Sequence, residues 1–244
     1  MHHVRVIFKR ELAAYFASPV AYVFIVIFVA LAGGLTFHVG GLFERGEADL
    51  RPFFQFHPWL YLLLVPAVGM RLWAEERKSG TIELLMTLPI RPAEAVIGKF
   101  LAAWTFLGLT LALTFPLWIT VNVLGRPDNG VILAAYLGSW LMAGGFLALS
   151  GIASALTRNQ VVAFILGATL SFVFMMSGVD LVQSLVRGWL PPVLAETIAG
   201  FSFLSHFNAI AQGVIDLRSL VFFASLIVAG LFINTIVVER GKGA

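Results

Sequence analysis

The chain has 244 residues, of which 59% are hydrophobic and only 12% are charged. A soluble domain usually carries about 25% charged residues, so this composition is typical of a protein that lies in a membrane. The sequence contains no cysteine, which excludes disulfides and thiolate-ligated metals. The formal charge of +3 comes from basic residues beside apolar stretches, a pattern that marks membrane orientation and not nucleic-acid binding.

Residues 2–17 predict an amphipathic helix that lies at the membrane surface. Charged side chains separate apolar ones that recur at helical spacing, namely Val4, Ile7, Phe8, Leu12, Tyr15 and Phe16. Ser18 and Pro19 break this helix before it reaches the length of a span. A cleavable signal peptide has a different pattern, so we expect residues 1–18 to be retained as an interfacial helix.

Six stretches are apolar enough to cross a bilayer, whose core of ~30 Å needs about 20 helical residues. They run over residues 20–40, 59–73, 100–124, 131–156, 161–179 and 220–238. The second stretch is short and contains Pro66, which favours a bend. The fold class is therefore an all-α integral membrane protein with six transmembrane helices, in a single domain over residues 1–244.

The segment between the fifth and sixth spans, residues 180–219, is too apolar for a solvated loop. Pro191, Pro192 and Gly200 interrupt it, so we expect two short helices in or near the outer interface.

Basic residues are distributed unequally between the two sides of the membrane. One side carries Arg5, Lys9, Arg10, Arg71, Arg77, Lys78, Arg91, Lys99, Arg158, Arg240 and Lys242. The other side carries Arg45, Arg51, Arg126, Arg187 and Arg218. Cytoplasmic segments are enriched in Lys and Arg, so both termini and the loop over residues 75–99 are expected to face the cytoplasm.

The charged segment over residues 75–90 predicts a short cytoplasmic helix between spans two and three. Ser79, Gly80 and Thr81 supply a helix start, Glu83 lies in the first turn, and Pro89 ends the helix. Apolar residues gather on one face of this helix or adjoin it: Ile82, Leu84, Leu85, Met86 and Leu88. An exposed apolar face outside the membrane indicates docking to another protein; the alternative is that the helix lies on the inner leaflet or packs under its own spans.

Residues 75–85 read EERKSGTIELL, followed by Pro89 and by Gly98-Lys99. This region resembles the signature of ABC-2 type permeases, and the order of spans and loops along the whole chain agrees with that family. Residues 10–22, RELAAYFASPVAY, and residues 58–60, PWL, are most similar to the gliding-motility-type (GldF-like) branch.

The resemblance implies that a coupling helix docks on a separate cytoplasmic ATPase. Its residues would be Ser79, Gly80, Thr81, Ile82, Glu83, Leu84, Leu85, Met86 and Thr87. Two ATPase copies would bind ATP and Mg, with no cofactor in this chain, and would drive an exporter built from two permease chains, identical or homologous. The protein would lie in the inner membrane of a bacterial cell, and the two short outer helices would cap the pathway.

The charged residues Glu75, Glu76 and Arg77 have two interpretations. They would either make transmission contacts, by steering the ATPase or pairing with the interfacial helix, or simply solvate a helix end.

Other functions have weaker support. The sequence lacks His-Glu-x-x-His and Gly-x-Ser-x-Gly, and Gly98-Lys99 is not part of a phosphate loop, so we expect no enzyme. An ion-gradient-driven transporter would need ionisable groups in the span centres, and a non-transporting scaffold would use the same exposed helix.

Small residues four apart in span four, Gly144 with Ala148 and Gly151 with Ala155, would form a dimer face or serve packing within one subunit.

Overall fold

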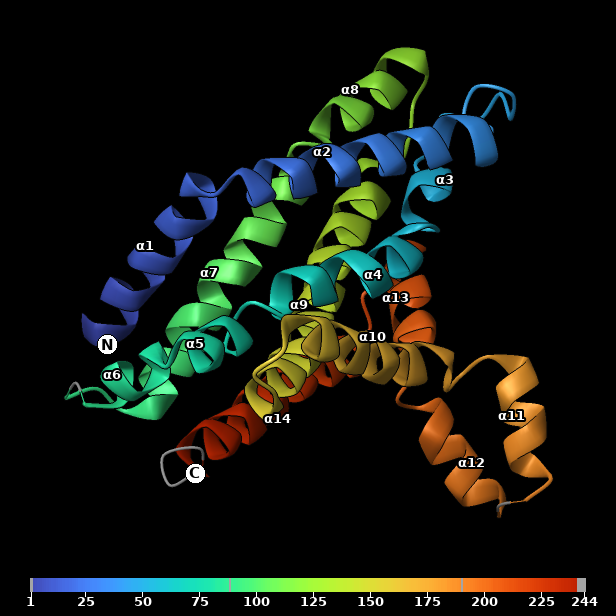
Figure 1. The fold of residues 1–244 in the computed structure, drawn as a ribbon. Helices are drawn as coiled ribbons and strands as arrows, with labels where there is room; N and C mark the ends of the chain where they lie inside the picture. The colour runs from blue at the N-terminus through green and yellow to red at the C-terminus, as the bar shows by residue number, and fades with distance from the viewer. Residues whose placement is uncertain (1, 88, 190, 241–244) are drawn as a thin grey trace.

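The computed structural model of the protein describes residues 2–87, 89–189 and 191–240, and every regular element in these ranges is a helix (Figure 1). Within these ranges four segments are long and apolar enough to cross a membrane: Pro19–Val39, Pro92–Leu124, Asn129–Leu156 and Leu217–Arg240. The pair Pro192–Ala199 and Phe203–Ala211, bent by 55°, would be a fifth. The all-helical membrane fold is thus confirmed, whereas six spans stay a prediction.

Helix α1 (His2–Ala17) and helix α2 (Pro19–Gly34) meet at Ser18. The Ser18 side chain accepts a hydrogen bond from the Val20 N–H, and Pro19 occupies the first turn of α2, where a missing N–H costs nothing. The chain continues from α2 into the π-helix Leu35–Val39.

Helix α4 (His57–Gly69) follows the short helix α3 (Arg51–Phe54). It has 13 residues. The predicted span extends to Trp73, but α4 ends at Gly69, because the chain turns there and restarts as helix α5 (Ala74–Ser79). At 1.5 Å per residue α4 covers about 20 Å, which is less than the full hydrocarbon core.

Helix α7 (Pro92–Ala112) begins eight residues before the predicted third span, so its first turns belong to the segment expected to be a loop. Pro92 suits the first turn, and the Glu94 carboxylate accepts a hydrogen bond from the Arg91 N–H. Helix α8 (Phe115–Leu124) continues in the same segment after a break. The break precedes Pro116, which has no N–H to donate.

Helix α9 (Asn129–Leu156) is the central element of the bundle. Its first N–H groups are capped by the Asp128 carboxylate. It packs against α4, α7, α10 (Gln160–Met176), α13 (Phe203–Ala211) and α14 (Leu217–Arg240), and α1 packs against α7.

The small residues of α9 allow its neighbours to approach closely. A Cβ on Gly144 would lie 2.8 Å from the Trp104 indole nitrogen, and one on Gly151 would lie 2.8 Å from the Asn234 amide nitrogen. A Cβ on Gly230 would lie 2.8 Å from the Cβ of Ala148. Gly144, Ala148 and Gly151 of span four therefore serve packing within the subunit, the second of the two alternatives.

The segment over residues 180–219 forms three helices where two were expected: α11 (Asp180–Arg187), α12 (Pro192–Ala199) and α13. The third begins because the Ser202 side chain accepts a hydrogen bond from the Ser205 N–H. Helices α11 and α12 pack on each other and project from the bundle, as Figure 1 shows at the lower right, whereas α13 returns to pack against α9.

Candidate functional site

The segment for which docking is predicted lies at the end of the bundle where α1 begins and α14 ends, which we call the terminal end (Figure 1). Helix α6 covers Thr81–Thr87, so seven of the nine candidate residues are helical in one element. Ser79 is instead the last residue of α5, and Gly80 joins the two helices. Residues 75–78, expected to lie in the cytoplasmic loop before the coupling helix, therefore belong to a helix of their own, α5.

The side chains of α6 are described in part. Glu83 is exposed, and Ile82 is half-buried and packs against the core of the bundle. The side chains of Leu84, Leu85 and Met86, and residue Leu88, lie outside the described part of the structure. The predicted apolar docking face therefore stays a prediction.

Hydrogen bonds join α5 to α6. The Ser79 hydroxyl lies 3.0 Å from the Glu75 carbonyl oxygen, to which it donates, and 2.9 Å from the Thr81 hydroxyl. Gly80 adopts a φ of +74°, a left-handed conformation that other residues reach only at a cost. The change of direction between the two helices is thus fixed by Gly80 and by side chains on both sides of it.

Lys99 of α7 is the centre of an ion-pair network at the terminal end. Its side chain is only 4% exposed, and its Nζ lies 2.8 Å from a Glu76 carboxylate oxygen and 3.3 Å from a Glu11 oxygen. Nζ also lies 5.3 Å from the centre of the Trp73 ring, within reach of a cation–π interaction. A buried ammonium needs such partners, so α1, α5 and α7 are joined through one charge.

Electrostatics at Glu11 keep this network charged. Burial by itself would raise the pKa of Glu11, but the positive charge of Lys99 and the hydrogen bond from Arg10 outweigh it and lower the pKa below its ordinary value. Glu11 therefore stays ionised at neutral pH, which the pairing with Lys99 requires.

The three predicted transmission residues have different surroundings. Glu76 pairs with Lys99, whereas Glu75 pairs with Arg71 at 3.1 Å on the more exposed side of α5. Arg77 faces another cation: burial and the charge of Arg158 lower the pKa of Arg77. Glu76 is therefore connected to helix α1 through Lys99, which also pairs with Glu11.

Ser154 of α9 holds the turn between α4 and α5. Its hydroxyl oxygen accepts hydrogen bonds from the N–H groups of Trp73 and Ala74, both at 3.0 Å, and donates one to the Met70 carbonyl at 2.7 Å. Ser154 is fully buried, so water cannot replace these bonds. The central helix is thereby attached to the point at which the chain leaves α4 for α5 and α6.

A cavity of about 360 Å³ lies between α1, α5 and the start of α7. Its wall includes Glu11, Tyr15, Arg71, Glu76 and Lys99. Among the described residues no three His, Asp or Glu side chains come close enough to hold a metal ion.

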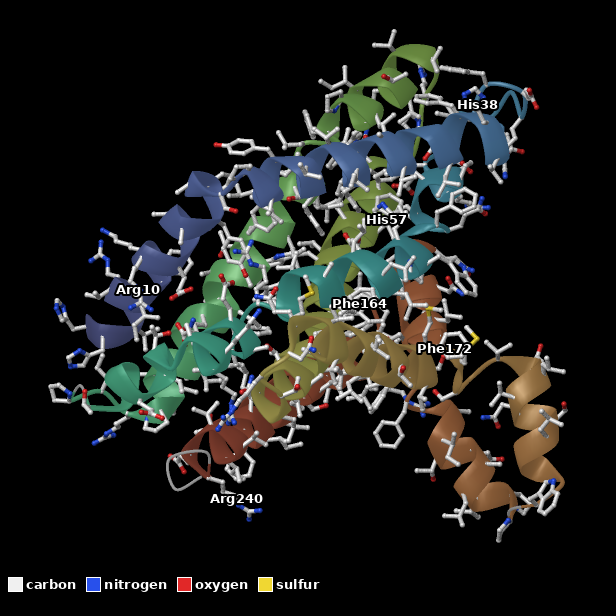
Figure 2. All side chains as sticks on the ribbon, in the orientation of Figure 1. Arg10, His38, His57, Phe164, Phe172 and Arg240 are labelled. Carbon is white, nitrogen blue, oxygen red and sulfur yellow. The ribbon has the colours of Figure 1, made fainter. Side chains whose placement is uncertain are left out.

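Figure 2 places the labelled residues along the bundle: Arg10 and Arg240 lie at the terminal end, and His38 lies at the opposite end. His57 lies in the interior, fully buried, with its Nδ1 2.7 Å from the Ser139 hydroxyl, which is 2.8 Å from the Tyr61 hydroxyl. This polar cluster connects α4 to α9 away from the terminal end.

The sequence did not indicate the roles of Lys99, Glu11 and Ser154. Lys99 was expected at the end of a loop, although Pro92 and Glu94 mark a helix start before it, and a lysine inside an apolar helix needs an acidic partner. Ser154 carries no such signal, because a serine in a span is usually bonded within its own helix.

Comparisons with known proteins identify the family. Residues 5–238 match the family described as ABC-2 family transporter protein. A comparison with curated proteins finds no match. Since the family covers nearly the whole chain, the protein belongs to the ABC-2 transporter family and is a transmembrane permease that serves membrane transport.

Proposed function

We propose that this permease is the membrane subunit of an ABC-2 type exporter that receives ATP-driven movement from a separate ATPase subunit. The observation that supports this most is the attachment of α5, which leads directly into α6. Ser154 of the central helix α9 accepts a hydrogen bond from Ala74, the first residue of α5. Glu76 of α5 pairs with Lys99 of α7, which also pairs with Glu11 of α1. A push on α6 would therefore reach several helices at once.

The proposed coupling helix comprises residues 79–87, and Glu75, Glu76 and Arg77 are the proposed transmission contacts. Closure of two nucleotide-binding subunits would displace α6, and the rigid helices would carry this displacement to a pathway between two permease chains. ATP and Mg would be bound by the partner subunits and not by this chain.

The proposed topology has six spans, formed by α2, α4, α7 with α8, α9, α10 and α14. Helix α10 has 17 residues, the lower limit of the usual range, and α4 packs against both α9 and α10 and is largely buried. The excess of basic residues at the terminal end supports a cytoplasmic position for both termini. The membrane would be the inner membrane of a bacterium, and the GldF-like branch is the proposed subfamily.

The test is purification of the tagged chain in mild detergent from its native host, with mass spectrometry of the proteins that co-elute. We expect a soluble subunit with a phosphate-loop sequence and two copies each of ATPase and permease in the complex. A preparation that transports substrate without any nucleotide-binding partner would overturn the proposal in favour of an ion-gradient-driven transporter. A complex with an ATPase that supports no transport would favour a scaffold.

A double variant tests the coupling helix itself. Glu83→Lys with Leu85→Asp should leave the protein inserted but abolish co-elution of the ATPase, because it changes both the charge of α6 and the apolar face predicted for it from the sequence. The matched control is Glu44→Lys with Phe43→Asp, at exposed residues near the opposite end of the bundle. Equal ATPase recovery with both double variants would exclude α6 as the docking helix.

A further inference from the structure

A second cavity at the terminal end has a basic wall. It lies between α5 and the turn that joins α9 to α10, and its volume is about 380 Å³, within the range of about 300–1,000 Å³ common for small-molecule sites. Its wall is formed by Lys78, Thr157, Arg158, Asn159, Gln160 and Val161. Among the described residues, this wall holds two cations and no carboxylate.

The cations at this cavity lack partners in the part of the chain that the structure describes. Neither Lys78 nor Arg158 takes part in an ion pair or side-chain hydrogen bond there. The two acidic residues of α5 are paired with other cations, Glu75 with Arg71 and Glu76 with Lys99. Arg77, next to Lys78 in sequence, has a buried Nε with no hydrogen-bond partner. Burial and, after it, the positive charge of Arg158 lower the pKa of Arg77. Uncompensated repulsion of this kind is relieved by an anion.

Helix α10 adds to the positive potential of the cavity. It begins at Gln160, in the cavity wall, after Asn159 has capped the Val161 N–H with its side-chain oxygen at 2.9 Å. The remaining N–H groups of a first turn have no acceptor within the helix, and the helix dipole favours a negative charge there.

The cavity opens beside an exposed apolar surface. Leu156 at the end of α9 and Val161 and Ile165 on α10 are 61%, 63% and 55% exposed. In a membrane protein such a surface faces acyl chains, and it starts at the basic wall itself, since Val161 belongs to both. A ligand with an anionic head and an apolar tail would contact both features at once.

We propose that this cavity binds a phosphate group, and that the adjoining surface of α10 selects the phosphate of an anionic phospholipid. The Lys78 ammonium and the Arg158 guanidinium would donate to the phosphate oxygens from two sides, with the first turn of α10 between them. The acyl chains would lie along Val161 and Ile165. The binding needs no ATPase, so its test is independent of the proposed coupling.

The experiment compares the full chain in nanodiscs of phosphatidylglycerol with the same chain in nanodiscs of phosphatidylcholine. Native mass spectrometry counts the lipids retained, and thermal unfolding measures the stabilisation. A third arm adds inorganic phosphate to the phosphatidylcholine sample. The variant is Lys78→Gln with Arg158→Gln, and the matched control is Lys9→Gln with Arg91→Gln, which removes two exposed cations at the same end of the bundle.

We expect the wild type to retain phosphatidylglycerol in preference to phosphatidylcholine and the variant to bind it more weakly by roughly fivefold for each cation removed. The control pair should retain the wild-type affinity for the lipid held at this site, because Lys9 and Arg91 do not line the cavity. If inorganic phosphate stabilises the wild type but not the variant, and phosphatidylglycerol has no effect, the cavity is a phosphate site whose ligand is free phosphate and not a lipid. The proposal would be overturned if the wild type showed no preference for phosphatidylglycerol over phosphatidylcholine and no stabilisation by inorganic phosphate. An equal loss of phosphatidylglycerol binding in the control pair would also overturn it. A general loss of stability in the variant does not obscure the result, because the effect of phosphatidylglycerol is measured against the same variant in phosphatidylcholine.

Discussion

The Ser154 hydroxyl accepts a hydrogen bond from the Trp73 N–H at 3.0 Å, and this bond joins the central helix α9 to the turn between α4 and α5. Ser150, which is also buried in α9, instead donates to the Phe146 carbonyl of its own helix. The two serines lie one helical turn apart and have different functions in the fold.

Replacing Ser154 by alanine should destabilise the protein. The change leaves the buried N–H groups of Trp73 and Ala74 without this acceptor, at a cost of about 1–3 kcal/mol for each unsatisfied group. Thermal unfolding in detergent measures the effect, and Ser150→Ala is the matched control. Equal unfolding temperatures for the two variants would contradict the role assigned to Ser154.

Replacing Lys99 by methionine should cost about 3–5 kcal/mol, because it leaves the half-buried Glu76 carboxylate unpaired and leaves Glu11 paired with Arg10 alone. The triple variant Lys99→Met, Glu11→Gln, Glu76→Gln should recover most of that loss, since no uncompensated charge remains. Arg71→Met serves as the control, because the exposed pair Arg71–Glu75 contributes at most about 1 kcal/mol. Chemical or thermal unfolding of the four proteins checks this, and a triple variant no more stable than Lys99→Met would disprove it.

The Glu11 carboxylate should make stability depend on pH in the acid range. Its pKa in the folded protein lies below the ordinary 4.5, so ionised Glu11 stabilises the fold above pH 4.5, and this contribution is lost as the pH falls through the lowered pKa. The difference in unfolding temperature between wild type and Glu11→Gln should therefore be constant above pH 4.5 and shrink below it. A difference that stays constant down to strongly acid pH would show that Glu11 is not held ionised by Lys99.

Adding a methyl group at Gly69 should force α4 away from α9. A Cβ there would lie 2.5 Å from the Ser150 Cβ, which cannot move without its helix, and overpacking of this kind costs about 1–3 kcal/mol. The control is Gly34→Ala in α2, where a Cβ meets nothing within 4 Å and alanine should stabilise the helix by about 0.5–1 kcal/mol. The two substitutions should therefore shift the unfolding temperature in opposite directions.

The sequence by itself determined the membrane class, the family and the positions of most helices. Long apolar runs specify spans because the bilayer gives a backbone no other way to satisfy its hydrogen bonds, and Ser18, Asp128 and Asn159 start their helices through local bonds. Such signals involve residues that are neighbours in the chain, so the pattern alone reveals them.

Only the tertiary structure decided which residues meet at the terminal end. Lys99 lies 88 positions from Glu11 and 23 from Glu76, and Ser154 lies 81 positions from Trp73. Contacts over such distances depend on how α1, α5, α7 and α9 pack, and no local propensity encodes that packing. The sequence therefore indicated the short helix after Gly80, and the fold determined which helices are joined to the α5–α6 segment, because a buried charge and a buried hydroxyl take their partners from whichever elements lie beside them.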